Sequence, residues 1–171
     1  MAEVYLSLGS NCEREKHIRA ALDALAGYFG ALVVSSVYES EAVGFSGASF
    51  LNLVVGINTS MSPGALSQLL KSIEDDNGRD RMAPKFSSRT LDIDILTYGD
   101  LKGMQEGVAL PRAEIVHNAF VLWPLSELAG DRIHPELGVS YAELWRDYRS
   151  AQLLRPVKFE WDGKQLPCLP S

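Results

Sequence analysis

The hydrophobic pattern at the start of the chain predicts a strand followed by a helix. Apolar and polar positions alternate over residues 4–8, which is the period of a half-buried β-strand, and the turn-forming residues 9–11 end it. Apolar side chains then recur at helical spacing, and Gly30 follows where a helix commonly ends with a left-handed residue. We therefore expect a helix from about Glu13 to Phe29.

The next segments predict two strands joined by a loop that contains glycine. Residues 31–38 form a short segment with β-branched side chains, which predicts a strand. A loop over residues 40–48 separates it from a strand over residues 49–59. Because side chains alternate between the two faces of a strand, Leu51 and Leu53 belong to the core face. Asn52 then lies on the opposite face, where it is accessible or points into a site.

A second helix and a fourth strand follow this pair. Residues 62–63 supply a serine N-cap and a proline at the first helical position, an apolar stripe follows, and Gly78 closes the helix. A polar loop over residues 79–89 leads into a strand over residues 90–98, where apolar residues alternate with two aspartates.

The order strand, helix, strand, strand, helix, strand is the β-α-β-β-α-β arrangement of ferredoxin-like domains. We expect an α+β fold in which an antiparallel sheet has two helices packed on one face. The remaining residues 100–171 must extend this core, with a loop at Pro111, an apolar stretch over residues 120–128 that a proline interrupts, and a helix from about Ser140. The last twenty or so residues are expected to form a tail on the outside. No repeat or linker divides the sequence, so residues 1–171 are predicted to be a single domain.

Composition adds that this is an ordinary globular chain. The 171 residues are 46% hydrophobic and 22% charged, with a formal net charge of −6, so a core large enough to offset chain entropy can form. No apolar run reaches the roughly 18 residues of a membrane-spanning helix, and no signal peptide opens the chain, which indicates a cytoplasmic protein. Cys12 and Cys168 suggest neither a disulfide framework nor a zinc site. Nothing in the sequence demands more than a monomer.

The acidic balance argues against a protein that binds nucleic acid by neutralising phosphates. An RNA-binding module remains an alternative, because RRM domains share the ferredoxin-like topology. The chain lacks the aromatic-rich strand of such modules, however, and its net charge has the wrong sign.

A basic loop that leads directly into two aspartates is the main candidate for chemistry. Asp92 and Asp94 are two positions apart on the predicted strand, so both carboxylates point to the same face. Four of the 16 basic residues lie within the eleven positions of the loop: Arg79, Arg81, Lys85 and Arg89.

The energetics of this pair favour a bound cation. Two carboxylates about 6 Å apart repel by roughly 3 kcal/mol at an effective dielectric constant near 20. Oxygen ligands without histidine or cysteine favour Mg²⁺, which fills its coordination shell with water and phosphate oxygens, and neighbouring arginines suit a polyphosphate. Taken alone, the aspartates are also typical of a solvated sheet face and the loop of ordinary surface. Their adjacency favours phosphoryl transfer, although the usual nucleotide-binding motifs are absent.

The segment R-D-R-M-A-P-K-F-S-S-R-T-L-D-I-D-I-L over residues 79–96 resembles the signature of the 6-hydroxymethyl-7,8-dihydropterin pyrophosphokinase family. The resemblance extends over nearly the whole chain. It includes V-Y-L-S-L-G-S-N at the start, S-S-V-Y-E-S, F-L-N at residues 50–52, and A-F-V-L-W-P-L from Ala119. It implies an enzyme of folate biosynthesis that transfers pyrophosphate from ATP to the hydroxymethyl oxygen of the pterin and releases AMP.

The resemblance also implies roles for individual residues in the ATP half of the site. Asp92 and Asp94 would hold two Mg²⁺ ions between the phosphates and the attacking hydroxyl. Arg79 and Arg89 match the catalytic arginines of the family. Further ATP contacts would come from Glu74, Arg81, Lys85, Arg89, Ile95 and Arg112.

In the pterin half, the resemblance implies that Asn52 binds the ring edge while the ring stacks between Phe50 and Phe120. Groups near Ser40 and Val43 would complete the pocket. A planar heterocycle with donors and acceptors on its rim suits aromatic faces and an amide. Without the resemblance, ordinary core packing of the two phenylalanines and a satisfied edge amide at Asn52 would be the simpler interpretation.

The chain departs from the family pattern near Pro111. Arg112 stands where the family usually has histidine, Ala113 where tyrosine is common, and Asn118 where an arginine is expected. The changes at Arg112 and Asn118 put two phosphate contacts of the family in doubt. Neither residue reproduces the geometry of the one it replaces. A divergent paralogue that binds pterin or nucleotide with weak or altered activity is therefore an alternative to the pyrophosphokinase.

Overall fold

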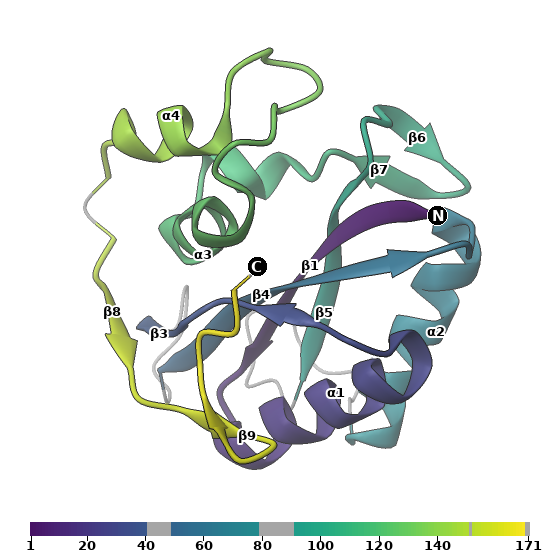
Figure 1. Ribbon diagram of the computed structural model, residues 1–171, viewed down its shortest axis with the longest axis vertical. Coiled ribbons are helices and arrows are strands. Elements are labelled where there is room, and N and C mark those ends of the chain that lie inside the picture. The colour runs from purple at the N-terminus through teal and green to yellow at the C-terminus, as the bar shows by residue number, and fades with distance from the viewer. Residues whose placement is uncertain (41–48, 79–90, 151, 170–171) are drawn as a thin grey trace.

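A computed structural model of the chain describes residues 1–40, 49–78, 91–150 and 152–169. Its centre is a six-stranded antiparallel sheet with the order β5-β1-β4-β3-β8, in which β2 also pairs with β4 (Figure 1). The strands of this sheet are β1 (Ala2–Ser10), β2 (Val33–Val34), β3 (Val37–Ser40), β4 (Phe50–Thr59), β5 (Asp92–Tyr98) and β8 (Leu154–Val157).

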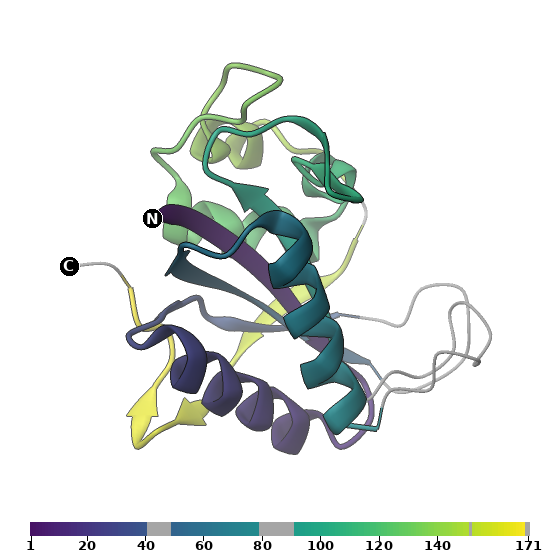
Figure 2. The same cartoon turned by 90° about the vertical axis from the view of Figure 1, so that its right-hand side faces the viewer.

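Helices cover both faces of the sheet. Figure 2 shows α1 and α2 on one side of the strands and the layer of α3 and α4 on the other. The helices are α1 (Arg14–Phe29), α2 (Pro63–Asp76), the 3₁₀ helix η1 (Ala113–Val116), α3 (Ala119–Ala129) and α4 (Tyr141–Arg146). Two hairpins complete the fold: β6 (Gly103–Gln105) with β7 (Val108–Leu110), and β9 (Glu160–Trp161) with β10 (Lys164–Gln165).

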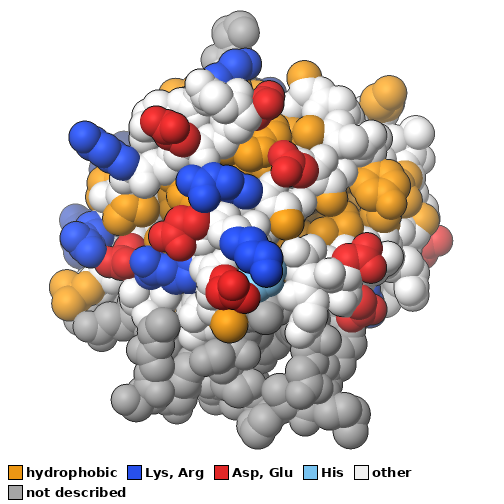
Figure 3. All heavy atoms as spheres, turned by 90° about the horizontal axis from the view of Figure 1, so that it is seen from below, with side chains coloured by type: hydrophobic (Ala, Val, Ile, Leu, Met, Phe, Trp, Pro, Cys, Tyr) orange, Lys and Arg blue, Asp and Glu red, His pale blue; other side chains and the backbone are white. Residues whose placement is uncertain are grey.

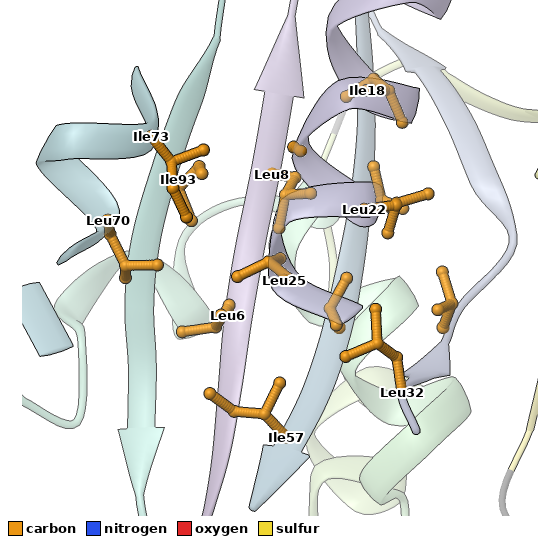
Figure 4. Close-up of a cluster of buried hydrophobic side chains, with 14 of the residues drawn as sticks. Leu6, Leu8, Ile18, Leu22, Leu25, Leu32, Ile57, Leu70, Ile73 and Ile93 are labelled. Atoms are coloured by element: carbon orange, nitrogen blue, oxygen red, sulfur yellow. The ribbon is translucent and has the colours of Figure 1, made fainter. Parts of the chain in front are cut away.

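The larger core cluster lies between the sheet and the helices α1 and α2. Leu22 and Leu25 of α1 are fully buried above Leu6 and Leu8 of β1, and Ile73 of α2 lies beside β5 (Figure 4). Burying a leucine or isoleucine side chain contributes roughly 1.5–3 kcal/mol each. This cluster therefore holds α2 against the strand that carries the two aspartates.

A second cluster fills the opposite face of the sheet. Tyr5, Val54 and Leu96 point from the strands toward α3, where Leu122 and Leu125 are buried. Helix α3 runs without a break through Pro124, whereas the sequence predicted an interruption there. Burial of its apolar face offsets the hydrogen bond that proline cannot donate.

The ferredoxin-like β-α-β-β-α-β order is confirmed, with one difference in the second strand. The expected strand over residues 31–38 is split into β2 and β3 because Ser35 interrupts it. The Ser35 hydroxyl accepts a hydrogen bond from the Val54 N–H at 2.9 Å, and both Ser36 N–H and Ser36 Oγ donate to the Glu127 carboxylate. Side-chain hydrogen bonds of this kind compete with the regular backbone ladder.

Most of the C-terminal segment, residues 152–169, is exposed, as expected of a segment on the outside, but it also adds a strand to the sheet and two side chains to the core. Strand β8 pairs with β3 at the edge of the sheet, and Phe159 and Leu166 are buried in the larger cluster. Arg19 of α1 donates to the Glu160 carbonyl oxygen at 2.9 Å and lies over the Phe159 ring. The segment is too short for its apolar residues to show the period of a strand or a helix. The pairing of β8 with β3 could therefore not be predicted from the sequence.

Viewed from the side of α1, the surface mixes acidic and basic side chains with apolar patches (Figure 3). This view shows no uniform basic patch among the residues that are coloured there. In the described ranges, no helix has both the length and the apolar character needed to cross a membrane.

Candidate active site

The two aspartates lie at an edge of the central sheet. Asp92 pairs with Gly9 and Asp94 with Ser7 of the neighbouring β1, and Ile93 between them is buried on the other face. Both carboxylates therefore lie on one face of β5, as their spacing predicts. The other long side of β5 has no strand partner within the described sheet, which leaves it open to side chains from α2.

A cavity of about 360 Å³ adjoins this edge. It brings together three parts of the chain: one face of α2, the start of β5, and the β6–β7 hairpin with the residues after it. Its lining comprises Ser67, Leu70, Lys71, Glu74, Asp92, Ile93, Asp94, Ile95, Gly107, Val108, Ala109 and Arg112. Five of the residues predicted on the ATP side thus share a single cavity: Glu74, Asp92, Asp94, Ile95 and Arg112.

Sequence reasoning missed Ser67 and Lys71 in the wall of this cavity. With Glu74 they form a polar stripe at positions i, i+4 and i+7 of α2, which places them on the same side of the helix. That spacing was visible in the sequence. Only the packing of α2 beside the edge of β5 shows that the stripe lines the same cavity as the aspartates.

Glu74 closes the open edge of β5. Its side chain is only 4% exposed, and Oε2 accepts a hydrogen bond from the Ile93 backbone N–H at 2.7 Å. An N–H at the edge of a sheet needs such a partner when it is buried. The acidic last turn of α2 therefore fixes the position of the strand segment between the two aspartates.

Arg112 is the described cation nearest to the acidic pair. Its Nη2 atom lies 3.6 Å from Asp94 Oδ1 and 2.8 Å from Glu114 Oε1, and its Nε also donates to Glu114. Burial raises the pKa of the Asp94 carboxyl above its ordinary value, and the nearby charge of Asp92 raises it further, while Arg112 acts in the opposite direction. Arg112 thus offsets part of the unfavourable charge that Asp94 meets from burial and from Asp92.

Such a site fits Mg²⁺ by the chemistry of its donors. Asp92 and Asp94 offer hard oxygen ligands on one face. The described residues contain no cluster of three or more histidine, cysteine or acidic side chains arranged to enclose an ion. Mg²⁺ commonly takes one or two carboxylates and completes its octahedron with water and substrate phosphates. The pair suits an ion that arrives with a phosphate ligand.

On the same face of the sheet, two strands bring Asn52 to Ser40. The Asn52 Nδ2 atom donates to Ser40 Oγ at 2.6 Å, and both side chains are buried at 7% exposure. Asn52 is thus not openly accessible, and the alternative that it points into a site stays a prediction. A Cβ atom on Gly9 would lie 3.1 Å from Asn52 Oδ1, so glycine at this position gives the amide oxygen its room.

The two predicted stacking residues come from different elements. Phe50 begins β4 and Phe120 is the second residue of α3, and each is half-buried. Phe120 packs against the second core cluster. Within the described part of the chain, no ring-to-ring contact joins Phe50 to Phe120, so their stacking role stays a prediction.

The altered positions near Pro111 have partners within the chain. Ala113 begins η1, and Asn118 Oδ1 accepts a hydrogen bond from Gln152 Nε2 at 3.2 Å. Gln152 Oε1 in turn accepts from the Ala119 N–H at 2.6 Å, which caps the start of α3. The remaining predicted site residues, Val43, Arg79, Arg81, Lys85 and Arg89, lie outside the described residues.

Solved structures share this fold. A crystal structure of HPPK-DHPS in complex with substrates superposes with a TM-score of 0.68 at 14% identity, covering 86% of this chain and 43% of the other. Plasmodium falciparum HPPK-DHPS with pteroate gives a TM-score of 0.65 at 16% identity, covering 86% of this chain and 42% of that one. This chain thus spans less than half of those solved chains.

Sequence comparisons identify the family. A relative from Aquifex aeolicus, a 2-amino-4-hydroxy-6-hydroxymethyldihydropteridine pyrophosphokinase, is 34% identical over 158 residues, covering 91% of this chain and 96% of the relative. The enzyme of the same name from Bacillus subtilis is 38% identical over 128 residues, covering 72% and 76%. The model of the 7,8-dihydro-6-hydroxymethylpterin-pyrophosphokinase family matches residues 5–130. The chain therefore belongs to the 7,8-dihydro-6-hydroxymethylpterin-pyrophosphokinase family.

Proposed function

We propose that this chain transfers the β,γ-pyrophosphoryl group of ATP to the hydroxymethyl oxygen of 6-hydroxymethyl-7,8-dihydropterin. Membership of the family makes it a diphosphokinase of folate biosynthesis that uses ATP and a pterin. In the reaction, the pterin oxygen forms a bond to the β-phosphorus while the bond from that phosphorus to the α-phosphate oxygen breaks. The products are the pterin diphosphate and AMP.

The cavity beside β5 is the proposed place of the ATP polyphosphate. Asp92 and Asp94 would hold Mg²⁺ ions there, which neutralise charge on the phosphate oxygens and orient the attacking hydroxyl when they are bound. Glu74 keeps the backbone between the two aspartates in place through its hydrogen bond to the Ile93 N–H. Ile95 and Arg112 belong to the same cavity wall and would contact the nucleotide.

Four cations of the loop over residues 79–89 complete the proposed ATP half. A polyphosphate whose leaving bond is breaking carries growing negative charge, and guanidinium groups stabilise that charge through paired hydrogen bonds. The assigned roles are catalysis for Arg79 and Arg89 and phosphate binding for Arg81, Lys85 and Arg89.

The pterin half is proposed on the same face of the sheet, where Ser40 and Asn52 meet. The short hydrogen bond between them fixes the orientation of the Asn52 amide, so its oxygen stays available next to Gly9. An amide held in one orientation can recognise a heterocycle that presents a donor at its rim. Phe50 and Phe120 would supply aromatic faces, and Val43 would complete the pocket.

The proposed enzyme works as a monomer in the cytoplasm. ATP as a co-substrate and the two free cysteines, Cys12 and Cys168, suit a reducing compartment.

The observation that carries the proposal is the cavity in which Asp92, Asp94, Glu74 and Arg112 meet. The test is an assay that follows nucleotide products with purified protein, Mg²⁺, ATP and the reduced pterin. We expect AMP and pterin diphosphate in equal amounts, with no AMP when the pterin is left out. Formation of ADP, or AMP release independent of pterin, would contradict the proposed reaction.

One observation favours a second function, a paralogue that binds its ligands but turns over slowly. Arg112 is held by Glu114 and lies against Asp94, so the cation that would contact phosphate is already paired. Calorimetry separates the two functions: pterin or ATP binding without detectable AMP formation would identify the weak paralogue. Binding together with stoichiometric AMP formation would exclude it.

A further inference from the structure

We propose that Arg112 is a built-in counter-cation for Asp94, which weakens the binding of free divalent metal until a nucleotide is present. The inference rests on the proposed function, because it concerns the same cavity, and it adds an order of events. Metal would enter this site together with the polyphosphate rather than ahead of it.

The position of Arg112 is fixed at both its backbone and its side chain. Its backbone N–H donates to the Leu96 carbonyl oxygen at 2.8 Å, which joins it to the same strand that carries Asp94. Its guanidinium is held by Glu114 through two hydrogen bonds, of 2.8 and 3.1 Å. The residue after Glu114, Ile115, is fully buried and anchors η1 in the second core cluster. Arg112 is therefore placed beside Asp94 before any ligand binds.

The guanidinium and a metal ion would compete for the same carboxylate. Nη2 of Arg112 lies 3.6 Å from Asp94 Oδ1, while the Asp94 side chain is 25% exposed and Arg112 is 37% exposed. A positive charge at this distance repels a dication that approaches the same oxygen, and the partial burial of both groups limits screening by salt. Arg112 therefore lowers the affinity of the acidic pair for an ion that arrives alone.

A nucleotide changes this balance because it brings negative charge of its own. Phosphate oxygens offer the guanidinium a partner that replaces Asp94, and paired hydrogen bonds from arginine to phosphate are strong. Asp94 is then free to coordinate the ion that the phosphates bring. Because Arg112 can exchange Asp94 for phosphate as its partner, it should oppose metal binding when no nucleotide is present and support the binding of the nucleotide itself.

The test measures Mn²⁺ alone, by the loss of the free-ion signal in electron paramagnetic resonance, on the full chain without nucleotide. Arg112→Gln removes the charge and keeps a long polar side chain, whereas Arg112→Lys keeps a cation at the position. We expect Mn²⁺ to bind about tenfold more tightly to Arg112→Gln than to the unchanged protein, with a much smaller change for Arg112→Lys. A variant that merely loses structure would bind the ion more weakly, so the direction of the change is diagnostic.

Arg132→Gln is the matched control. Arg132 also makes a paired contact to a carboxylate, that of Glu3 near the start of β1, and its loss alters the net charge equally. Mn²⁺ affinity should not change in this variant. A similar gain in both variants would show a general charge effect and would overturn the role of Arg112.

The second measurement is the affinity for α,β-methylene ATP with Mg²⁺, since this analogue lacks the bond that would be cleaved. Arg112→Gln should bind it several-fold more weakly. Unchanged or weaker Mn²⁺ binding by Arg112→Gln would overturn the inference, while pterin-dependent AMP release by the unchanged protein would leave the proposed function intact. Absence of that release would count against the proposed function instead.

Discussion

Asp92 and Asp94 are held together at a cost to the folded state. Each is a carboxylate beside another carboxylate at a partly buried edge, and burial together with the charge of Asp92 raises the pKa of Asp94. An asparagine at either position would have a similar shape without the repulsion between two like charges, so the second charge does not serve the fold. The pair is therefore best explained by the cation that it attracts.

Replacement of one carboxylate by its amide tests this explanation. Asp92→Asn should lower the rate of AMP formation by about 100-fold or more, because a metal ligand is lost. The free energy of unfolding should stay within about 1 kcal/mol of the unchanged protein, since repulsion is also removed. Steady-state kinetics and urea denaturation measure the two quantities.

Asp100→Asn serves as the control for that variant, because Asp100 is an exposed residue just beyond the same strand. Its activity should equal that of the unchanged protein. Full activity of Asp92→Asn, in a folded protein, would contradict the metal role.

Asn52 should affect the use of pterin and leave the use of ATP almost unchanged. Asn52→Ala removes the proposed partner of the pterin rim, so the KM for pterin should rise at least about tenfold, as expected for the loss of a hydrogen bond in a closed site. The KM for ATP should change less than about twofold. An equal rise in both constants would indicate a general distortion of the sheet instead.

Local sequence patterns predict only some of the residues that meet at the site. The i, i+2 spacing of Asp92 and Asp94 fixes their common face, and the alternation along β4 places Asn52 and Phe50 together. Nothing local to Lys71 reveals that it reaches the same cavity, and Arg112 was expected there only from the family resemblance. Their neighbours are distant in sequence, and only tertiary packing brings them close.

At the scale of elements, one hydrogen bond joins α2 to β5 beside the site. Glu74→Ala would leave the buried Ile93 N–H without its acceptor, which should cost about 1–3 kcal/mol. Hydrogen exchange at the Ile93 amide, followed by NMR, should become faster than at Ile95 of the same strand. Glu74→Gln keeps an acceptor and should retain most of the protection.

Exchange at Ile93 that is equally slow in Glu74→Ala and in the unchanged protein would mean that Glu74 does not hold the strand. Activity would then have to depend on Glu74 through its charge alone. The Gln variant distinguishes these cases, because it removes the charge while keeping an oxygen in place.

Long periodic elements were predicted well and short ones were not. Apolar stripes identify the helices α1 and α2, and alternation of apolar and polar residues identifies the strands β1, β4 and β5. In each case the pattern gives the kind of element and its bounds to within a few residues. Strands β6 and β7 of the hairpin have three residues each and β8 has four, too few to show a period, and β8 also pairs with the distant strand β3. The hairpin forms a wall of the cavity, so the least predictable element contributes directly to the site.

Across the whole molecule, Glu39 joins three segments that are far apart in sequence. Oε2 of this residue in β3 accepts a hydrogen bond from Arg14 of α1 at 2.8 Å, and Oε1 pairs with Arg155 of β8. Arg14 also donates to Ser49, just before β4. The cluster therefore ties the C-terminal segment and the first helix to the strands that carry Ser40 and Asn52.

This cluster predicts how stability depends on acid. Hydrogen bonds from Arg155 and Arg14 lower the pKa of Glu39 from 4.5 to about 2. A carboxyl with a lowered pKa stabilises the fold fully above its unfolded value, and this contribution is lost as the pH falls from about 4.5 toward 2. Glu39→Gln should therefore be less stable than the unchanged protein at pH 7, and the difference should shrink across that interval.

Urea denaturation of both proteins at a series of pH values measures this difference. Glu160→Gln, on the exposed hairpin β9–β10, is the control and should show no comparable pH dependence. A difference between Glu39→Gln and the unchanged protein that stays constant down to pH 2 would contradict the ionic origin of the contact.

The fold of the whole molecule followed from its sequence up to residue 98, while the role of the C-terminal third did not. Pairing of β3 with β8 joins residues more than a hundred positions apart, and no local pattern encodes such a partner. The position of the second helical layer, α3 and α4, likewise depends on the tertiary fold, because these helices cover the face of the sheet that α1 and α2 leave open.

The most direct test is a crystal structure with Mn²⁺, α,β-methylene ATP and the reduced pterin bound. Anomalous scattering should place Mn²⁺ between the phosphate oxygens and the carboxylates of Asp92 and Asp94, with the pterin ring beside Asn52. Phosphates bound elsewhere, with both carboxylates facing solvent and free of metal, would contradict the central claim that this pair anchors the polyphosphate.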